Sequence, residues 1–273
     1  MENNLHRNRI VVKVGTSTLT NDMGKDNLRS FEKLAYVLAD IHNLGYEIIL
    51  VSSGAIAVGA NRLNLKTRPK SMCMKQAAAA VGQSSIMYLY DKFFCECSKT
   101  TAQILLNAED MESEEKKQNL TNTFDTLLEM GVIPVVNEND SVSCTEIESE
   151  DRLFSDNDML SAITAVLCGA QKLIILSDID GFYDCDPRVY ENAHLIKRVD
   201  IIDEKMQSFA GGAGSRRGTG GMYTKLKAAK LAASHGIDTI VTNGKNPEVL
   251  YDIINGADVG TLFCGKKQDT THR

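Results

Sequence analysis

A glycine-rich run at residues 218–225 combines residue types that suit binding of a phosphate group. It reads Gly-Thr-Gly-Gly-Met-Tyr-Thr-Lys and leads into an Ala/Leu/Lys run that predicts a helix to about Ser234. Glycines carry no Cβ, so several backbone N–H groups can converge on one anion, and the positive N-terminal end of the following helix faces the same point. Lys225 adds a cation within about the first turn. The run favours a phosphate-binding loop, although a flexible loop with a surface lysine explains the same residues in isolation.

Four further polar loops resemble the first in character, and three of them follow predicted strands. Residues 13–17 offer a lysine and a glycine turn with two hydroxyls, and residues 52–55 offer hydroxyls and N–H groups at a helix start. Residues 137–140 and 156–158 supply amides and carboxylates. Two lysines, glycine turns and few other charges suit phosphoryl transfer, in which positioning and charge neutralisation do most of the catalysis.

The chain that must position these loops alternates short apolar strands with longer helices. Polar or glycine-containing turns follow nearly every strand at its C-terminal end, where open α/β sheets bind their ligands. This alternation predicts a parallel sheet with crossover helices. We expect strands over residues 9–14, 47–51, 102–106, 132–136, 172–176 and 238–241. We expect helices over residues 27–43, 71–97, 119–130, 158–168 and 222–234, and a short helix after Pro247.

The composition is that of an ordinary globular protein and limits its partners. The 273 residues are 43% apolar and 24% charged, which suits one large domain or two lobes that share a sheet. The formal net charge of −6 argues against nucleic acid or an anionic membrane as a partner, so any ATP site must be made locally positive. The seven cysteines lack metal-ligand spacing and are expected to be free thiols. Without an apolar membrane span or secretory signal, a cytoplasmic location is expected.

Several common catalytic motifs are absent from the sequence. It has no G-x-x-x-x-G-K-[ST] loop, no G-x-G-x-x-G after a strand, no protein-kinase motif and no G-x-S-x-G serine. The five histidines are scattered. We interpret the acidic stretches 109–115 and 146–151 as solvated faces or mobile loops rather than metal sites, the second of them close to the substrate. Hydrolase, zinc-enzyme and dehydrogenase interpretations therefore lose their usual support.

Seven motifs follow one another along residues 9–264: V-V-K-V-G-T-S, V-S-S-G-A-I-A-V-G, A-A-V-G-Q, P-V-V-N-E-N-D, S-D-N-D-M-L-S-A, L-S-D-I-D-G-F-Y-D-C-D-P-R and G-T-G-G-M-Y-T-K-L-K-A-A. In this order they resemble the glutamate 5-kinase branch of the amino acid kinase family. N-E-N-D, followed by D-N-D-x-L-S-A and G-T-G-G-M-x-T-K, favours this branch over its relatives. Many bacterial members carry an extra C-terminal RNA-binding-like (PUA) domain, which we do not expect here because the resemblance ends near Gly265. The Gly/Arg-rich segment 211–217 receives no assignment.

The resemblance implies transfer of the ATP γ-phosphoryl group to the side-chain carboxylate of L-glutamate, with Mg²⁺, to give L-glutamate 5-phosphate, the first step of proline biosynthesis. It implies a three-layer α/β/α sandwich with a central, mostly parallel sheet, of the carbamate kinase-like kind. One domain over residues 1–265 would hold a substrate lobe to about residue 170 and a nucleotide lobe from about residue 171, with a tail at 266–273. Inhibition by proline and homo-oligomers of two or four subunits are further implications. The chemistry suits the residues, since a carboxylate with a reference pKa near ~4.3 is ionised at pH 7 and needs no general base.

The resemblance also assigns catalytic roles to three residues. Lys13 would contact the transferring phosphoryl group from one side, and Lys225 would lie on the side of the leaving β-phosphate. Asp158 would hold both ammonium groups in place. Without the resemblance, Lys13 would be interpreted as a strand-end lysine with a solvated head. Asp158 could also be the N-cap of the helix that follows it.

Substrate and nucleotide residues are implied in the same way. Asp140 suits glutamate because the α-ammonium group needs an anionic partner, whereas an acetylated substrate would leave a buried carboxylate unpaired. Asp140 and Asn157 could instead be turn or cap residues. The implied substrate-binding residues are Ser53, Gly54, Ala55, Asp140 and Asn157. The implied nucleotide-binding residues are Lys13, Gly15, Ser177, Asp178, Thr219, Gly220, Gly221, Met222, Tyr223, Thr224 and Lys225.

Two alternative functions remain open from the sequence. The chain could be another member of the family that acts on acetylglutamate, aspartate, carbamate or a nucleotide. It could also be a non-catalytic sensor of an amino acid or nucleotide on the same fold. A sensor could lose Lys13, Lys225 or Asp158 and still bind, so the presence of all three favours an enzyme.

Overall fold

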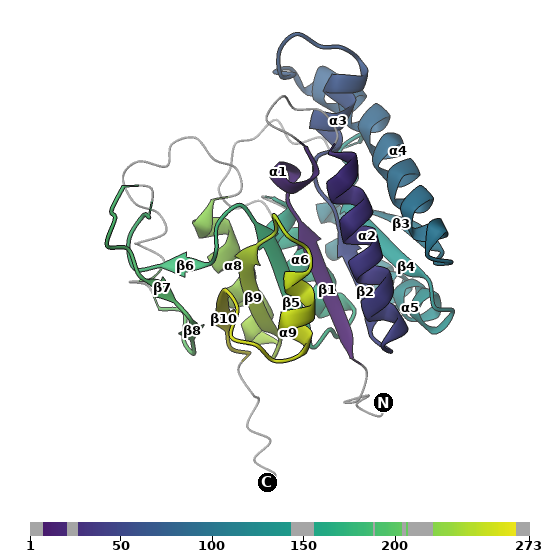
Figure 1. Ribbon diagram of the computed structural model, residues 1–273. Helices are drawn as coiled ribbons and strands as arrows, with labels where there is room; N and C mark the ends of the chain where they lie inside the picture. Colours follow the sequence, from purple (N-terminus) through teal and green to yellow (C-terminus); the bar gives the residue numbers. More distant parts are fainter. Residues whose placement is uncertain are drawn as a thin grey trace.

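The computed structural model describes residues 8–20, 27–142, 156–187, 189–203, 206 and 221–265. Its centre is an eight-stranded sheet in the order β3-β4-β2-β1-β5-β9-β10-β8 (Figure 1). Neighbouring strands pair in parallel, except that β10 is antiparallel to β9. A short antiparallel hairpin, β6–β7, lies outside this sheet. The strands are β1 Arg9–Val14, β2 Glu47–Val51, β3 Thr101–Leu106, β4 Ile133–Glu138, β5 Lys172–Ser177, β6 Phe182–Tyr183, β7 Leu195–Ile196, β8 Arg198–Val199, β9 Asp238–Asn243 and β10 Thr261–Phe263.

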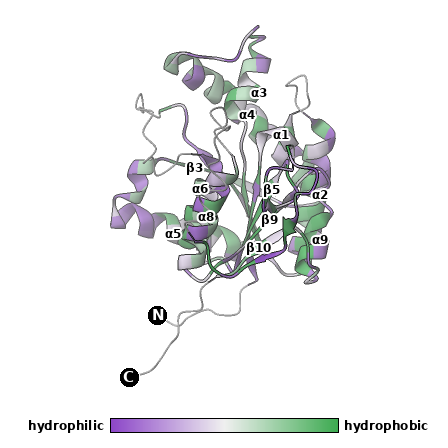
Figure 2. Cartoon of the chain, turned by 90° about the vertical axis from the view of Figure 1, so that its left-hand side faces the viewer, coloured by the Kyte–Doolittle hydropathy of each residue, from purple (hydrophilic) through white to green (hydrophobic). Residues whose placement is uncertain are grey.

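Helices cover both faces of the sheet. One apolar core contains residues of α2, α3, α4 and α9, and a second contains residues of α5, α6 and α8. Figure 2 shows α5, α6 and α8 on one side of the strands and α2 and α9 on the other. The helices are α1 Thr16–Leu19, α2 Leu28–Asn43, α3 Ala55–Arg62, α4 Met72–Glu96, η1 Ala108–Met111, α5 Glu114–Glu129, α6 Asn157–Leu167, α8 Met222–Ser234 and α9 Val249–Ile254. The predicted three-layer α/β/α sandwich with a mostly parallel sheet is confirmed.

Strand β1 is buried on both faces of the sheet. Ile10, Val12 and Val14 belong to the core with α2 and α4, whereas Val11 belongs to the core with α6 and α8. Successive side chains of a strand alternate between faces, and a parallel strand covered on both sides is apolar nearly throughout. Lys13 is two residues after Val11, so it points to the α6/α8 side.

Helices α3 and α4 cross at backbone contact. A Cβ on Gly59 would lie 1.7 Å from the carbonyl oxygen of Ala78, and a Cβ on Gly82 would lie 1.8 Å from that of Ala55. Only glycine permits this approach. The crossing fixes the start of α3 at the end of β2, next to the cleft described below.

The six predicted strands and the predicted long helices are present, with boundary shifts of a few residues. The prediction of a tight turn at residues 15–17 is wrong, because residues 16–19 form the short helix α1 with Gly15 as its N-cap. The acidic stretch 109–115 is a solvated face rather than a mobile loop, because it forms most of η1 and begins α5 while its glutamates are exposed. Strands β6, β7, β8 and β10, of two or three residues each, were not predicted.

The second acidic stretch, 146–151, and the segment 211–217 lie outside the described residues. The described cysteines are free thiols, as expected. None of the described helices is both long enough and apolar enough to cross a membrane.

Candidate active site

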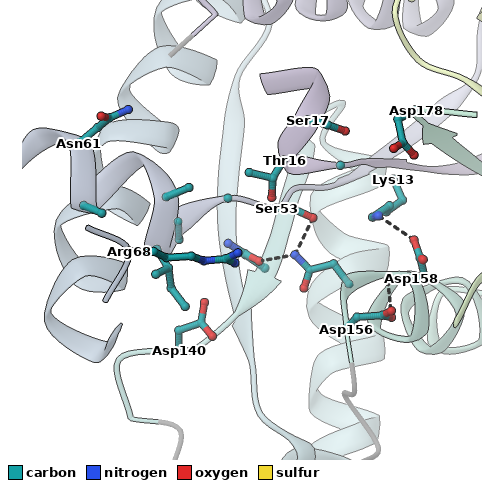
Figure 3. Close-up of a pocket in the computed structure, with 18 of the residues that line it drawn as sticks. Lys13, Thr16, Ser17, Ser53, Asn61, Arg68, Asp140, Asp156, Asp158 and Asp178 are labelled. Atoms are coloured by element: carbon teal, nitrogen blue, oxygen red, sulfur yellow. Dashed lines mark hydrogen bonds and ion pairs between the residues drawn. The ribbon is translucent and has the colours of Figure 1, made fainter. Parts of the chain in front are cut away.

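A cleft of about 1040 Å³ opens at the carboxyl ends of β1, β2, β4 and β5. This is the edge of the sheet where parallel α/β folds bind ligands. Its lining comes from the predicted loops of residues 13–17, 52–55, 137–140 and 156–158, together with Ser177, Asp178 and Lys225. Figure 3 shows Lys13 and Asp158 on one side of the cleft and Arg68 and Asp140 on the other.

Lys13, Asp158 and Lys225 form a buried charge cluster. Lys13 Nζ lies 2.6 Å from Asp158 Oδ1, and Lys225 Nζ lies 3.1 Å from Asp158 Oδ2. Asp158 is fully buried, and the two lysines are 7% and 4% exposed. Strand β1, helix α6 and helix α8 each supply one member, so the packing of three elements sets the distances.

The electrostatics of this cluster favour an ionised Asp158. Burial alone would raise the pKa of the Asp158 carboxyl, but the positive charges of Lys13 and Lys225 and their hydrogen bonds hold it below its usual value. Thr224 Oγ1 donates a further hydrogen bond to Asp158 Oδ2 at 2.9 Å. With one carboxylate and two ammonium groups, the cluster carries a net positive charge beside the cleft.

Asp156, rather than Asp158, is the N-cap of α6. Its Oδ1 accepts from the backbone N–H groups of Asp158 at 3.0 Å and Met159 at 3.1 Å. The alternative interpretation of Asp158 as the cap is therefore wrong, and its carboxylate is left for the lysines. The pKa of Asp156 is raised, first because burial disfavours its charged form and then because Asp158 is negatively charged.

Asn157, the first residue of α6, links this helix to the end of β2 and to β4 next to the cleft. Its Nδ2 lies 2.7 Å from Ser53 Oγ, 2.9 Å from the Ser52 carbonyl oxygen and 3.2 Å from Asn137 Oδ1. Asn137 in turn donates to Gln83 Oε1 of α4 at 2.8 Å. Asn137 and Gln83 were not predicted as site residues, although both lie inside recognised motifs, N-E-N-D and A-A-V-G-Q.

Gly54 makes the turn from β2 into α3. Its φ of +97° is a left-handed conformation that residues with a Cβ rarely adopt. The turn brings the first N–H groups of α3, beginning with Ala55, to the cleft. Gly15 has an ordinary φ of −81°, and a Cβ there would lie 3.8 Å from Lys13 Nζ. A side chain at position 15 would thus fill space next to the lysine.

The structure brings most of the predicted site residues to one cleft. All five predicted substrate residues line it, as do Lys13, Gly15, Ser177, Asp178 and Lys225. Thr219 and Gly220 lie outside the described residues, and Gly221 is the N-cap of α8. Met222 packs against the apolar core, and Tyr223 is exposed with the Lys227 ammonium 4.7 Å from its ring centre. Cleft residues that the sequence did not single out include Asn61, Lys66, Thr67 and Arg68.

Solved structures of other proteins share this fold at low sequence identity. The chain superposes on carbamate kinase from Giardia lamblia with a TM-score of 0.67 at 16% identity, covering 96% of this chain and 99% of that one. A UMP kinase from Bacillus anthracis gives a TM-score of 0.63 at 16% identity, covering 95% and 97%. At this identity the likeness shows the fold alone.

Sequence comparison then gives the family. Residues 8–243 match the profile of the amino acid kinase family, and the chain belongs to that family. It is 57% identical to a glutamate 5-kinase from Clostridium perfringens over 95% of this chain and 96% of the relative. It is 48% identical to a glutamate 5-kinase from Listeria innocua over 97% and 95%. The resemblance inferred from the seven motifs is thereby confirmed.

Proposed function

We propose that this chain is an enzyme that transfers the γ-phosphoryl group of ATP to the side-chain carboxylate of L-glutamate. The products are L-glutamate 5-phosphate and ADP, and the reaction is the first step of proline biosynthesis. The glutamate 5-kinases that match nearly the whole chain support this function. The observation that carries it is the Lys13–Asp158–Lys225 cluster beside a cleft that also holds Asp140.

The chemistry requires two anions to meet, and the cleft provides for this. A γ-carboxylate oxygen of glutamate forms a bond to the γ-phosphorus, and the bond from that phosphorus to the β–γ bridging oxygen breaks. ADP leaves with the electron pair. The carboxylate is already ionised at neutral pH, so no residue needs to remove a proton. Lys13 neutralises negative charge on the transferring phosphoryl group, and Lys225 neutralises it on the side of the leaving β-phosphate. Both contacts speed the reaction because they are stronger in the transition state than in the ground state.

The substrate side of the cleft suits a free amino acid. Asp140 is proposed to pair with the α-ammonium group, and Ser53 and Asn157 to hydrogen-bond the substrate. The N–H groups at Gly54 and Ala55 face the carboxylate that accepts the phosphoryl group. Proline, a cyclic relative of glutamate, is proposed to inhibit from this same subsite, and the protein to work as a homo-oligomer.

The nucleotide is proposed to bind beside Gly15, Ser177 and Asp178 and to the loop of residues 219–225. The division into a substrate lobe before about residue 170 and a nucleotide lobe after it follows this distribution of residues. ATP use is a property of the kinase family.

Mg²⁺ is proposed to enter with the nucleotide. The described residues contain no group of three or more His, Cys, Asp or Glu side chains that could hold a metal ion by themselves. Asp156 lines the cleft and uses its Oδ1 to cap α6, and its buried Oδ2 is proposed to face the cation. When bound, Mg²⁺ would neutralise phosphate charge.

ADP release with glutamate, aspartate and acetylglutamate offered separately tests the function. We expect turnover with glutamate and little with the other two, because aspartate is shorter and acetylglutamate has no α-ammonium group for Asp140. Turnover with aspartate or acetylglutamate in place of glutamate would indicate another family activity. Binding of ATP or glutamate without any ADP release would indicate the sensor.

A further inference from the structure

Four cationic side chains line the cleft among the described residues, and two of them are already paired. Lys13 and Lys225 both contact the buried Asp158 carboxylate. Lys66 and Arg68 belong to the segment between α3 and α4 and are exposed to solvent. The cleft thus has a second pair of positive charges, which the proposed phosphoryl transfer does not use.

Arg68 is directed at the amino-acid side of the cleft. In Figure 3 its side chain extends from the α3–α4 segment toward the centre of the cleft, with Asp140 beside it and Lys13 and Asp158 on the opposite side. It makes no ion pair or hydrogen bond with the described part of the chain. Its guanidinium group is therefore available to a ligand.

The backbone at Arg68 is held in place by its neighbour. Pro69 is buried, whereas residues 66–68 and Lys70 around it are exposed. A proline restricts the residue before it to extended conformations, and a buried ring anchors the segment to the body of the protein. The position from which the Arg68 side chain starts is thus defined before substrate binds.

The charges of the substrate leave one group without a partner. Free glutamate has two carboxylates and one ammonium group. The side-chain carboxylate must reach the phosphoryl group beside Lys13, and Asp140 takes the ammonium group in the proposed function. The α-carboxylate remains, on the Asp140 side of the cleft, and a planar guanidinium can bind a carboxylate through two parallel hydrogen bonds.

We propose that Arg68 binds the α-carboxylate of the amino-acid substrate and acts with Asp140 to recognise the α-amino acid end. This inference rests on the proposed function and adds a specificity-determining residue to it. Arg68 contacts a part of the substrate that does not react, so its contribution is to substrate binding in the ground state and transition state alike.

Steady-state ADP release by Arg68→Ala, Arg68→Lys and the unaltered protein tests the assignment. We expect Arg68→Ala to raise KM for glutamate about 10- to 100-fold, with kcat and KM for ATP within a few fold. The KM of Arg68→Lys for glutamate should lie between those of Arg68→Ala and the unaltered protein. A lysine keeps the positive charge but cannot form the two parallel hydrogen bonds of a guanidinium group. Lys70→Ala is the matched control, since it removes one positive charge from the same segment at a residue outside the cleft lining.

A second substrate separates recognition of the carboxylate from a general effect on the site. Glutamate α-amide keeps the side-chain carboxylate and the α-ammonium group but has no α-carboxylate. Arg68→Ala should lower kcat/KM for glutamate far more than for the α-amide. An equal loss on both substrates, an unchanged KM for glutamate, or a loss in Lys66→Ala that is absent in Arg68→Ala would each overturn the proposal. Failure of the unaltered protein to use glutamate at all would instead overturn the proposed function.

Discussion

The two sides of the cleft hold their charges in different ways. On the phosphoryl side, Lys13, Asp158 and Lys225 are buried and paired with one another before any substrate binds. On the amino-acid side, Arg68 is exposed and extends into the cleft from a segment between two helices. Groups that stabilise a transition state gain from being fixed in advance, because they then need no reorganisation during the reaction. Groups that select a substrate must stay accessible to it.

This comparison predicts the largest loss of activity on the phosphoryl side. Lys225→Ala should lower kcat on the order of 10³-fold, because the lost ammonium acts most strongly on the transition state. The fold should persist, since Asp158 keeps Lys13 as a partner. Lys230→Ala, at an exposed position of the same helix, is the control. ADP release and circular dichroism measure the two properties, and equal turnover by Lys225→Ala and the unaltered protein would remove Lys225 from catalysis.

Asp140 and Asp178 provide a second comparison, between the proposed glutamate subsite and the proposed nucleotide subsite of the cleft. Asp140→Asn should raise KM for glutamate about 10- to 100-fold with less effect on kcat, because the α-ammonium group loses a charged partner. Asp178→Asn should change KM for ATP and leave KM for glutamate near its original value. If both variants changed KM for the same substrate, the assignment of Asp140 to the ammonium group and Asp178 to the nucleotide would be wrong.

The α3–α4 crossing beneath the amino-acid side predicts a smaller effect, on stability. Gly82→Ala would place a Cβ 1.8 Å from the Ala55 carbonyl oxygen, so the helices must separate, at a cost of about 1–3 kcal/mol in the free energy of unfolding. Val81→Ala, the neighbouring exposed position, is the control. Urea denaturation measures both. Equal free energies of unfolding for Gly82→Ala and Val81→Ala would contradict this prediction and show that α3 and α4 can move apart without loss of stability.

The smallest expected effect concerns Asp156. Its folded-state pKa is raised by burial and by the Asp158 charge, so the ionised carboxyl costs stability at pH values above that pKa. This cost disappears as the pH falls through the folded-state pKa toward the unfolded value near ~3.9. Asp156→Asn keeps an N-cap acceptor and should therefore be slightly more stable at pH 7 and no more stable near pH 3. Denaturation at both pH values checks this, and a less stable variant at pH 7 would contradict it.

Activity of the same variant connects Asp156 to the proposed metal. If its carboxylate faces Mg²⁺, Asp156→Asn should require more Mg²⁺ for half-maximal ADP release while it gains stability. An unchanged Mg²⁺ requirement would leave Asp156 with its capping role alone.

The sequence by itself determined the strand–turn–helix order and most of the cleft residues. Apolar β-branched runs such as β1 favour buried strands, and the polar turns at the carboxyl ends of parallel strands meet at one edge of the sheet. The motifs then predicted that Lys13, Asp158 and Lys225 act together. Strands β6, β7, β8 and β10 escaped prediction because two or three residues carry no periodic signal.

Only the tertiary structure decided which groups share a space. Residues 13, 158 and 225 meet because β1, α6 and α8 pack against one another, and no spacing along the chain specifies a distance of 2.6 Å between Lys13 and Asp158. The same holds for Asp156, which takes the capping role that the sequence left open for Asp158. Arg68 lies in an exposed polar segment without a pattern of its own, and only the structure shows that its side chain extends into the cleft. Local sequence sets the conformation of each element, whereas the contacts between elements are set by how their apolar faces pack.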